Sequence, residues 1–238
     1  MPGYTRRQLK EDKFAETAQG AAQWATGHRS LVVWSISLIV MIVLATVGII
    51  TWRNRQIEQG NEDLAAAMRI LNAPLRQPGT PPPAAGDTPS FTSATERAKA
   101  AEKQLAQIAD KYSLVPPGKI GRYLHGVALL QIGDKTAAEQ EIKKAADSGD
   151  KDLAALAKMT LASLYRDSNR QGDAAKIYKD LADHPATTVS KSTAQLALAE
   201  MYEKTDPAQA TAIYQQVQKE DPQSDAARVA AQKLTRPK

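Results

Sequence analysis

The apolar residues of the chain form one long uninterrupted run near its beginning, LVVWSISLIVMIVLATVGIITW, from Leu31 to Trp52. The run contains no charged residue, and at about 1.5 Å per residue a helix of this length spans about 33 Å, enough to cross the hydrocarbon core of a bilayer. Trp34 and Trp52 lie near its two ends, where indole rings prefer the lipid headgroups. A cleaved signal peptide has a shorter apolar stretch and a shorter leader. The pattern therefore predicts a retained transmembrane helix over residues 31–52.

The basic residues on the two sides of this run predict its orientation. Before the run lie Arg6, Arg7, Lys10, Lys13 and Arg29, and the comparable window after it holds Arg53, Arg55 and Arg69. Because flanks rich in Lys and Arg stay in the cytosol, we expect a cytosolic N-terminal segment, residues 1–30, and a C-terminal part on the outer side. A weak stripe of mostly alanine in residues 1–30 leaves two alternatives open, an amphipathic helix on the membrane surface and a solvated tail.

The pattern after the span changes twice before it becomes regular. Residues 53–73 keep a helical pattern, so we expect the helix to extend out of the membrane and to supply the first repeat helix. Residues 74–92 then carry six prolines, which exclude a helix interior and a strand ladder, at positions 74, 78, 81, 82, 83 and 89. The spacing of Pro78 and Pro81 also fits a PxxP peptide ligand, although such matches are common in proline-rich segments. We expect a flexible or polyproline-like loop.

Helical periodicity returns at residue 93 and continues to residue 234, with helix-start signals at SATE (residues 93–96) and DPAQ (residues 206–209). Within this segment a small residue followed by a bulky one recurs in two series. The first series steps by 36 and 37 residues and pairs Gly126, Ala162 and Ala199 with Leu129, Tyr165 and Tyr202. The second series steps by 36 residues and pairs Ala138, Ala174 and Ala210 with Ile142, Tyr178 and Tyr214.

This spacing predicts an all-α fold, a solenoid of stacked helical hairpins. A small residue lets two helix backbones approach, and a bulky residue one turn later fills the adjoining groove. Repeated about every 36 residues, such pairs stack neighbouring hairpins on one another. Ala101 and Leu105 mark an earlier half-unit, whose partner helix we expect at residues 64–71. A last helix at residues 225–234 should cap the repeat domain (residues 93–234), and the tail at 235–238 should be loose.

At these residues the chain resembles the tetratricopeptide repeat family, from about Ser93 to Pro222. The shared features are the small and aromatic residues of both helices and the proline that ends a unit, here Pro185 and Pro222. The chain departs from the family pattern because it lacks the tryptophan of the first helix and because its period exceeds the usual 34 residues. With its single N-terminal span, it is similar to the bacterial family of the ancillary subunit of the Sec translocon. That tetratricopeptide-like domain family also includes a periplasmic cell-division coordinator.

Composition and charge agree with this class. Hydrophobic residues make up 42% of the chain but aromatic residues only 5%, which favours closely packed helices over a β-sandwich. The net charge of +5 arises from 31 basic and 26 acidic residues spread along the whole chain, so we expect no nucleic-acid partner. The chain has no cysteine, which excludes disulfides, thiol nucleophiles and cysteine-based metal sites.

The motifs that carry chemistry are missing from the sequence. The three histidines, His28, His125 and His184, show no metal-ligand spacing, and we expect His125 to be a packed or half-exposed residue. Residues 133–136 (GDKT) and 118–120 (GKI) resemble fragments of a phosphate-binding loop, but neither is complete, and we interpret both as turns between helices. We therefore expect no enzyme activity, no catalytic, cofactor-binding or metal site, no cofactor and no small-molecule substrate.

The resemblance implies a single-pass protein of the bacterial inner membrane with a periplasmic repeat domain. Its expected role is a protein–protein interaction scaffold, an ancillary factor that links the Sec translocon to periplasmic chaperones or clients. Two alternatives remain open, a scaffold that coordinates cell division or the cell envelope, and an organelle import receptor with cytosolic repeats. The partner-binding residues are not assigned, although the repeat register brings six positions to one groove: Tyr123, Met159, Arg166, Leu196, Glu200 and Glu203.

Overall fold

A computed structural model of the chain describes residues 24–77, 79–81 and 89–235. The residues described there are helical except for turns, loops and one isolated β-bridge, so the all-α prediction is confirmed. The amphipathic helix or tail expected at residues 1–30 falls mostly outside the described residues, and so does the loose tail after residue 235. The chain divides into two compact units, residues 1–55 and residues 56–238.

The first unit contains the apolar part of helix α2, which runs from Arg29 to Leu71 and continues into the second unit. Among the described residues, α2 is the one helix long and apolar enough to cross a bilayer, and none of its most apolar 18-residue stretch is buried inside protein. Leu44 and Ile49, in the middle of this stretch, expose more than half of their surface. A buried core helix of a soluble domain would have this stretch covered, so α2 is a candidate membrane span.

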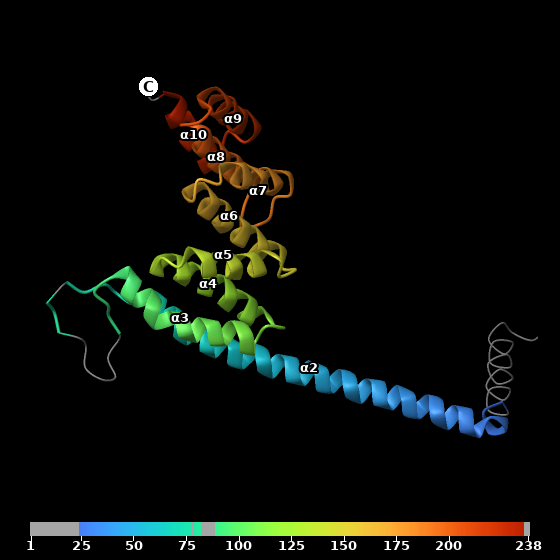
Figure 1. The fold of residues 1–238 in the computed structure, drawn as a ribbon. Helices are drawn as coiled ribbons and strands as arrows, with labels where there is room; N and C mark the ends of the chain where they lie inside the picture. Colours follow the sequence, from blue (N-terminus) through green and yellow to red (C-terminus); the bar gives the residue numbers. More distant parts are fainter. Residues whose placement is uncertain (1–23, 78, 82–88, 236–238) are drawn as a thin grey trace, which may run out of the picture. The chain divides into compact units, whose positions relative to one another are not determined.

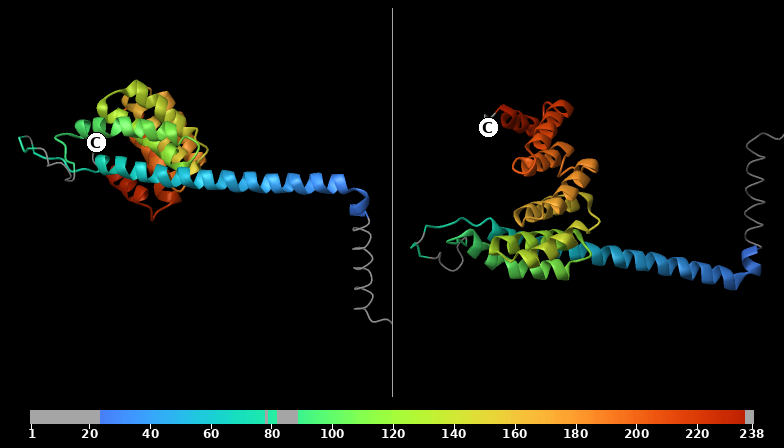
Figure 2. Two further views of the ribbon diagram at one scale, coloured as in Figure 1. Left: turned by 90° about the horizontal axis from the view of Figure 1, so that it is seen from below. Right: turned by 45° about the horizontal axis from the view of Figure 1, so that its top comes forward.

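The second unit stacks its helices in the order of the sequence, as the colours from green to red show (Figure 1 and Figure 2). Its helices after α2 are α3 (Ala94–Lys111), α4 (Pro116–Ile132), α5 (Lys135–Ala146), α6 (Lys151–Asp167), α7 (Gln171–Asp183), α8 (Lys191–Tyr202), α9 (Pro207–Glu220) and α10 (Asp225–Thr235). Each helix packs on the next one, which is the arrangement of stacked hairpins.

Side-chain caps begin most of these helices. Ser93 Oγ accepts a hydrogen bond of 3.0 Å from the Glu96 backbone N–H, and Asp206 Oδ1 accepts one of 3.0 Å from Gln209 N–H, at the two starts that the sequence predicts. The Glu96 carboxylate accepts from the N–H of Thr92, at 2.6 Å, in addition to the backbone bond from Ser93 that completes a capping box. These bonds satisfy backbone N–H groups that the first turn of a helix leaves unpaired.

The two glycine segments at residues 118–120 and 133–136 have different structures. Gly133 ends α4 with a φ of 97°, a left-handed conformation that favours glycine, and Asp134 caps α5. Gly118 lies inside the first turn of α4, so the interpretation of residues 118–120 as a turn is wrong. The helix begins earlier because Pro116 and Pro117 fit its first positions. A Cβ at Gly118 would lie 2.0 Å from the carbonyl oxygen of Tyr112, so close packing explains this glycine.

The last part of α2 pairs with α3, as the half-unit in the sequence predicts. Leu64 and Ala67 of α2 lie in one buried cluster with Ala98, Ala101 and Leu105 of α3. The cluster closes one end of the stack, because the apolar face of α3 is covered by α2 on one side and α4 on the other.

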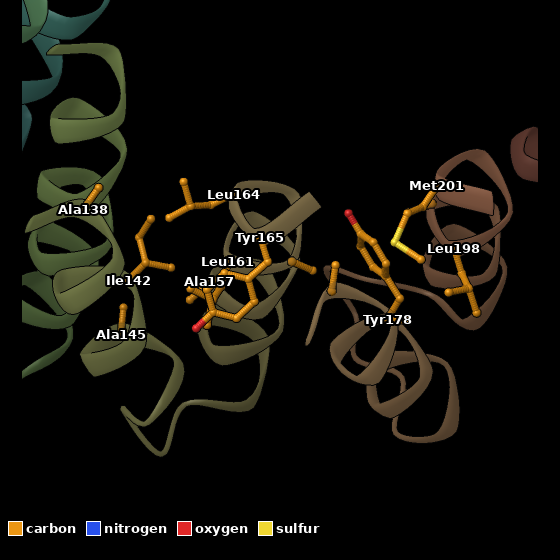
Figure 3. Close-up of a cluster of buried hydrophobic side chains, with 14 of the residues drawn as sticks. Ala138, Ile142, Ala145, Ala157, Leu161, Leu164, Tyr165, Tyr178, Leu198 and Met201 are labelled. Atoms are coloured by element: carbon orange, nitrogen blue, oxygen red, sulfur yellow. The ribbon is translucent and has the colours of Figure 1, made fainter. Parts of the chain in front are cut away.

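The small and bulky pairs of the sequence form the core between the later helices. Ala138, Ala174 and Ala210 each expose 2% of their surface or less, and their partners Ile142, Tyr178 and Tyr214 are buried as well. Figure 3 shows how Tyr178 of α7 points toward Met201 of α8, and how Ile142 of α5 faces the side chains of α6. Gly126 is the small residue of the first series in α4. A Cβ at this position would lie 2.6 Å from Ile142 Cγ1, so α4 and α5 are in close contact.

The proline-rich segment between α2 and α3 is held at both ends. An isolated bridge joins Leu75 to Phe91, where Arg76 N–H donates to the Phe91 carbonyl at 2.8 Å. Arg97 of α3 also donates from Nη1 to the Ala73 carbonyl at 2.9 Å. The loop between these contacts includes residues 78 and 82–88, which lie outside the described residues.

Candidate protein-binding surface

The helices α4, α6 and α8 are the first helices of successive hairpins. They carry five of the six positions that the repeat register places in one groove, and the sixth, Glu203, directly follows α8. We call these six residues the first-helix face: Tyr123, Met159, Arg166, Leu196, Glu200 and Glu203. The hydroxyls of Tyr123 and Thr160 lie 3.2 Å apart and connect α4 to α6. This contact joins Tyr123 to the helix that carries Met159 and Arg166.

Three members of the first-helix face are apolar and half-buried. Tyr123 and Met159 pack against the cluster around Ile142 and Tyr178, and Leu196 packs against the cluster around Tyr214. Each side chain is therefore held by the core and still has accessible surface. Apolar surface that is held in place loses little entropy when a partner covers it, which favours binding.

The other three members are charged and cluster toward the C-terminal end of the stack. Glu203 accepts a hydrogen bond of 2.8 Å from the Tyr214 hydroxyl and one of 2.9 Å from Lys233 Nζ. Burial and this bond to Glu203 together raise the pKa of Tyr214. Burial of Arg166 lowers its pKa. The bond to Asp167 and nearby charges, which include Glu200, outweigh the effect of burial, so that the pKa of Arg166 is raised. Arg166, Glu200 and Glu203 keep accessible surface through which they can pair with charges on a partner.

A different set of charges joins α3, α4 and α5. Arg122 donates from Nη1 to Glu141 at 2.8 Å and from Nη2 to Asp110 at 3.2 Å. His125 Nε2 lies 3.0 Å from Glu102 Oε1, and its side chain is 13% exposed. The expectation of a packed or half-exposed histidine is confirmed, and an ion-pair contact explains it. In the described part of the chain, no group of three or more His, Asp or Glu side chains is placed to hold a metal ion.

The acidic residue with the most strongly shifted pKa is Glu139 of α5, which joins three helices. Its carboxylate accepts from Lys143 Nζ at 2.6 Å, from the Tyr165 hydroxyl at 3.0 Å and from Arg170 Nη1 at 3.0 Å. The Arg170 guanidinium also lies 3.8 Å from the centre of the Tyr165 ring. The bond from Lys143 lowers the pKa of Glu139 most, and the bonds from Arg170 and Tyr165 lower it further. Burial acts in the opposite direction but is outweighed, so the pKa falls to about 2. These contacts tie α5, α6 and α7 together.

Sequence analysis does not find these charge clusters, because their members are far apart in the chain. Glu139 and Arg170 are 31 residues apart, and His125 and Glu102 are 23 apart. A weak signal exists only for Lys143, which follows Glu139 at the (i, i+4) spacing of a helix pair. The clusters hold helices together, and the accessible chemistry of the surface is that of apolar and charged contacts with another protein.

Comparison with known proteins agrees with this architecture. A family model described as a tetratricopeptide repeat-like domain matches residues 23–177, which is more than half of the chain. The match begins ahead of α2, includes the apolar run, and ends within α7. The comparisons with curated proteins and with solved structures find no significant match.

Proposed function

Because the chain belongs to the family of tetratricopeptide repeat-like domains, we propose that it is a membrane-anchored scaffold that binds other proteins through the first-helix face. The observation that carries this proposal is the family match itself, which covers the apolar part of α2 together with the helices from α3 into α7. In this proposal residues 31–52 are the anchor and residues 93–234 present the binding surface. The scaffold uses no catalytic residue and no cofactor.

We further propose that the scaffold is an ancillary factor of the Sec translocon in the bacterial inner membrane. The basic residues before the span favour a cytosolic N-terminal segment and periplasmic repeats. An anchor confines the repeats to the membrane surface and raises their effective concentration near other membrane proteins, so weak contacts become occupied. The neighbours expected for such a factor are channel subunits beside the span and periplasmic chaperones or emerging clients beside the repeats.

Site-specific photo-crosslinking in cells tests this proposal. We place benzoylphenylalanine at Tyr123 or Leu196 of the first-helix face and, separately, within the span at Val43. Lys176 of α7, whose side chain is 82% exposed, is the matched control outside the face. We expect channel subunits on the span and soluble chaperones or clients on the first-helix face, with little capture at Lys176.

Three outcomes would contradict parts of the proposal in different ways. Capture of cell-division or cell-wall proteins by the repeats, with only lipid at the span, would replace the translocon role with that of an envelope coordinator. Capture of cytosolic precursors would support the import-receptor alternative. Equal capture at Lys176 and at the first-helix face would reject this face as the binding surface.

A further inference from the structure

A second surface lies on α8, where α7 and α9 flank it. A hollow of about 490 Å³ is lined by the start of α8 and the end of α9, and a second one of about 250 Å³ by α7, α8 and α9; Gln195 lines both. The smaller hollow has an apolar lining from Ala182, Leu198 and Ile213. We call this surface the Gln195 groove.

The repeat itself shows what is unusual about Gln195. Arg122, Lys158 and Gln195 occupy equivalent positions of α4, α6 and α8, separated by 36 and 37 residues. Arg122 is bonded to Glu141 at 2.8 Å, and Lys158 to Asp180 at 2.6 Å. In the hairpins α4–α5 and α6–α7, the side chain at this position is therefore paired with an acidic residue on the second helix of the same hairpin.

Gln195 lacks such a complete partnership, although only 7% of its surface is exposed. Its Nε2 lies 3.5 Å from Glu220 Oε2, at the limit of a hydrogen bond, and no described group donates to its Oε1. A buried acceptor without a donor costs about 1–3 kcal/mol. The contact with Glu220 orients the amide, and Oε1 is closed to solvent in this orientation, so a donor from outside, such as a peptide N–H, reaches it once the amide turns toward the groove.

The charges of the groove favour a basic occupant. Asp183 ends α7 in the smaller hollow, and Asp221 follows α9 in the larger one; neither has an ion pair within the described residues. Both carboxylates stand at helix C-termini, where the helix dipole adds negative potential. Lys191 is neutralised by Glu220 at 2.8 Å, which leaves Lys179 as the single unpaired cation lining the described groove.

We propose that the Gln195 groove binds an extended segment of a partner protein in which an apolar residue is flanked by basic residues. The apolar side chain fills the hollow at Leu198 and Ile213, and the basic side chains reach Asp183 and Asp221. The Gln195 amide turns toward the segment, and Oε1 then accepts a hydrogen bond from one of its backbone N–H groups. This surface is distinct from the first-helix face, so its test does not depend on the proposed function.

The test uses the full chain in zwitterionic nanodiscs and the pentapeptide Gly-Lys-photoleucine-Lys-Gly as the probe, with crosslinks located by mass spectrometry. We expect crosslinks in the segments that contain Leu198 and Ile213. Gln195→Leu removes the acceptor while keeping an apolar side chain of similar size, and should lower the crosslink yield about threefold to tenfold below saturation. It should leave the melting temperature unchanged or raise it, because it also removes a buried unpaired atom.

Matched controls separate the groove from general effects. Gln107→Leu makes the same substitution at an exposed position of α3 and should leave the yield unchanged. A probe with Glu in place of both Lys residues should crosslink poorly, and empty nanodiscs report lipid binding. The proposal is overturned if crosslinks fall on the first-helix face or on lipid only, if Gln195→Leu has no effect on the yield, or if the acidic probe crosslinks as well as the basic one.

Discussion

At the residue scale, alanines at repeat-spaced positions decide how closely the helices pack. Ala174 is fully buried next to Ala175 and Tyr178 in the cluster that joins α5, α6, α7 and α8. Lys176, two residues later, points away from that cluster and its side chain is 82% exposed. The difference follows from helix geometry, in which residues two apart lie on different faces.

Ala174→Leu should therefore destabilise the protein by about 1–3 kcal/mol, because the added carbon atoms have no space in a packed seam. Urea unfolding followed by circular dichroism measures this cost. Lys176→Leu is the matched control and should cost far less, since its side chain is exposed and its ion pair with Asp173, at 3.7 Å, is long. Equal costs for the two substitutions would show that Ala174 is not the contact residue of this seam.

Glu139 makes stability depend on pH at acidic values. Its pKa is lowered from 4.5 in the unfolded chain to about 2 in the folded one, so its contribution is complete above pH 4.5 and is lost as pH falls toward 2. We expect Glu139→Gln to lower the free energy of unfolding by about 1–2 kcal/mol at pH 7, a value discounted for partial exposure. Unfolding curves at pH 7 and pH 3 check this.

The variant should lose less stability than the wild type between these two pH values, and the loss that remains comes from other carboxylates with lowered pKa values, such as Glu141 and Asp180. Glu62→Gln is the matched control, because Glu62 is exposed on α2 and has no bonded partner in the described structure. A pH dependence that Glu139→Gln leaves unchanged would contradict the role of this carboxylate.

At the element scale, the contacts described for the proline-rich loop lie at its two ends. The bridge between Leu75 and Phe91 and the bond from Arg97 to Ala73 lie outside the span from Gln77 to Pro89. Replacing residues 77–89 by a Gly/Ser linker of similar length should therefore change the melting temperature by less than about 2 °C, because loop closure costs change slowly with length and composition.

Thermal unfolding of the linker variant measures this prediction, and Arg97→Met provides a reference for sensitivity. That substitution removes the bond to the Ala73 carbonyl and should lower the melting temperature measurably, since a half-buried acceptor loses its donor. A large drop for the linker variant would show that the middle of the loop packs against the helices.

At the scale of the whole molecule, the proposed orientation makes a direct prediction. If the segment before Arg29 is cytosolic and the repeats are periplasmic, protease added to spheroplasts should digest the repeats and spare the N-terminal segment. Immunoblots with tags at each end measure this. Moving three arginines to the region after Trp52 should reduce the digested fraction, and protection of the repeats in the unaltered protein would reverse the orientation.

The sequence by itself determined the parts of this protein that depend on local pattern. The candidate span from Leu31 to Trp52, the all-α class, the two repeat series and the pairing of residues 64–71 with Ala101 and Leu105 all follow from residue size and hydrophobicity at helical spacing. Such features are readable because a helix fixes which residues share a face before any tertiary contact forms.

Only the tertiary structure decided the features that join distant residues. A glycine is needed at position 118 because a Cβ there would lie 2.0 Å from the carbonyl oxygen of Tyr112, a contact that the sequence pattern does not reveal. Glu139 meets Arg170, 31 residues away, only after α5 and α7 are stacked around α6. The unpaired acceptor of Gln195 depends on how far α9 lies from α8, and this distance is set by the packing of the whole stack. Residue spacing predicts which helices form, whereas packing decides which polar groups find partners.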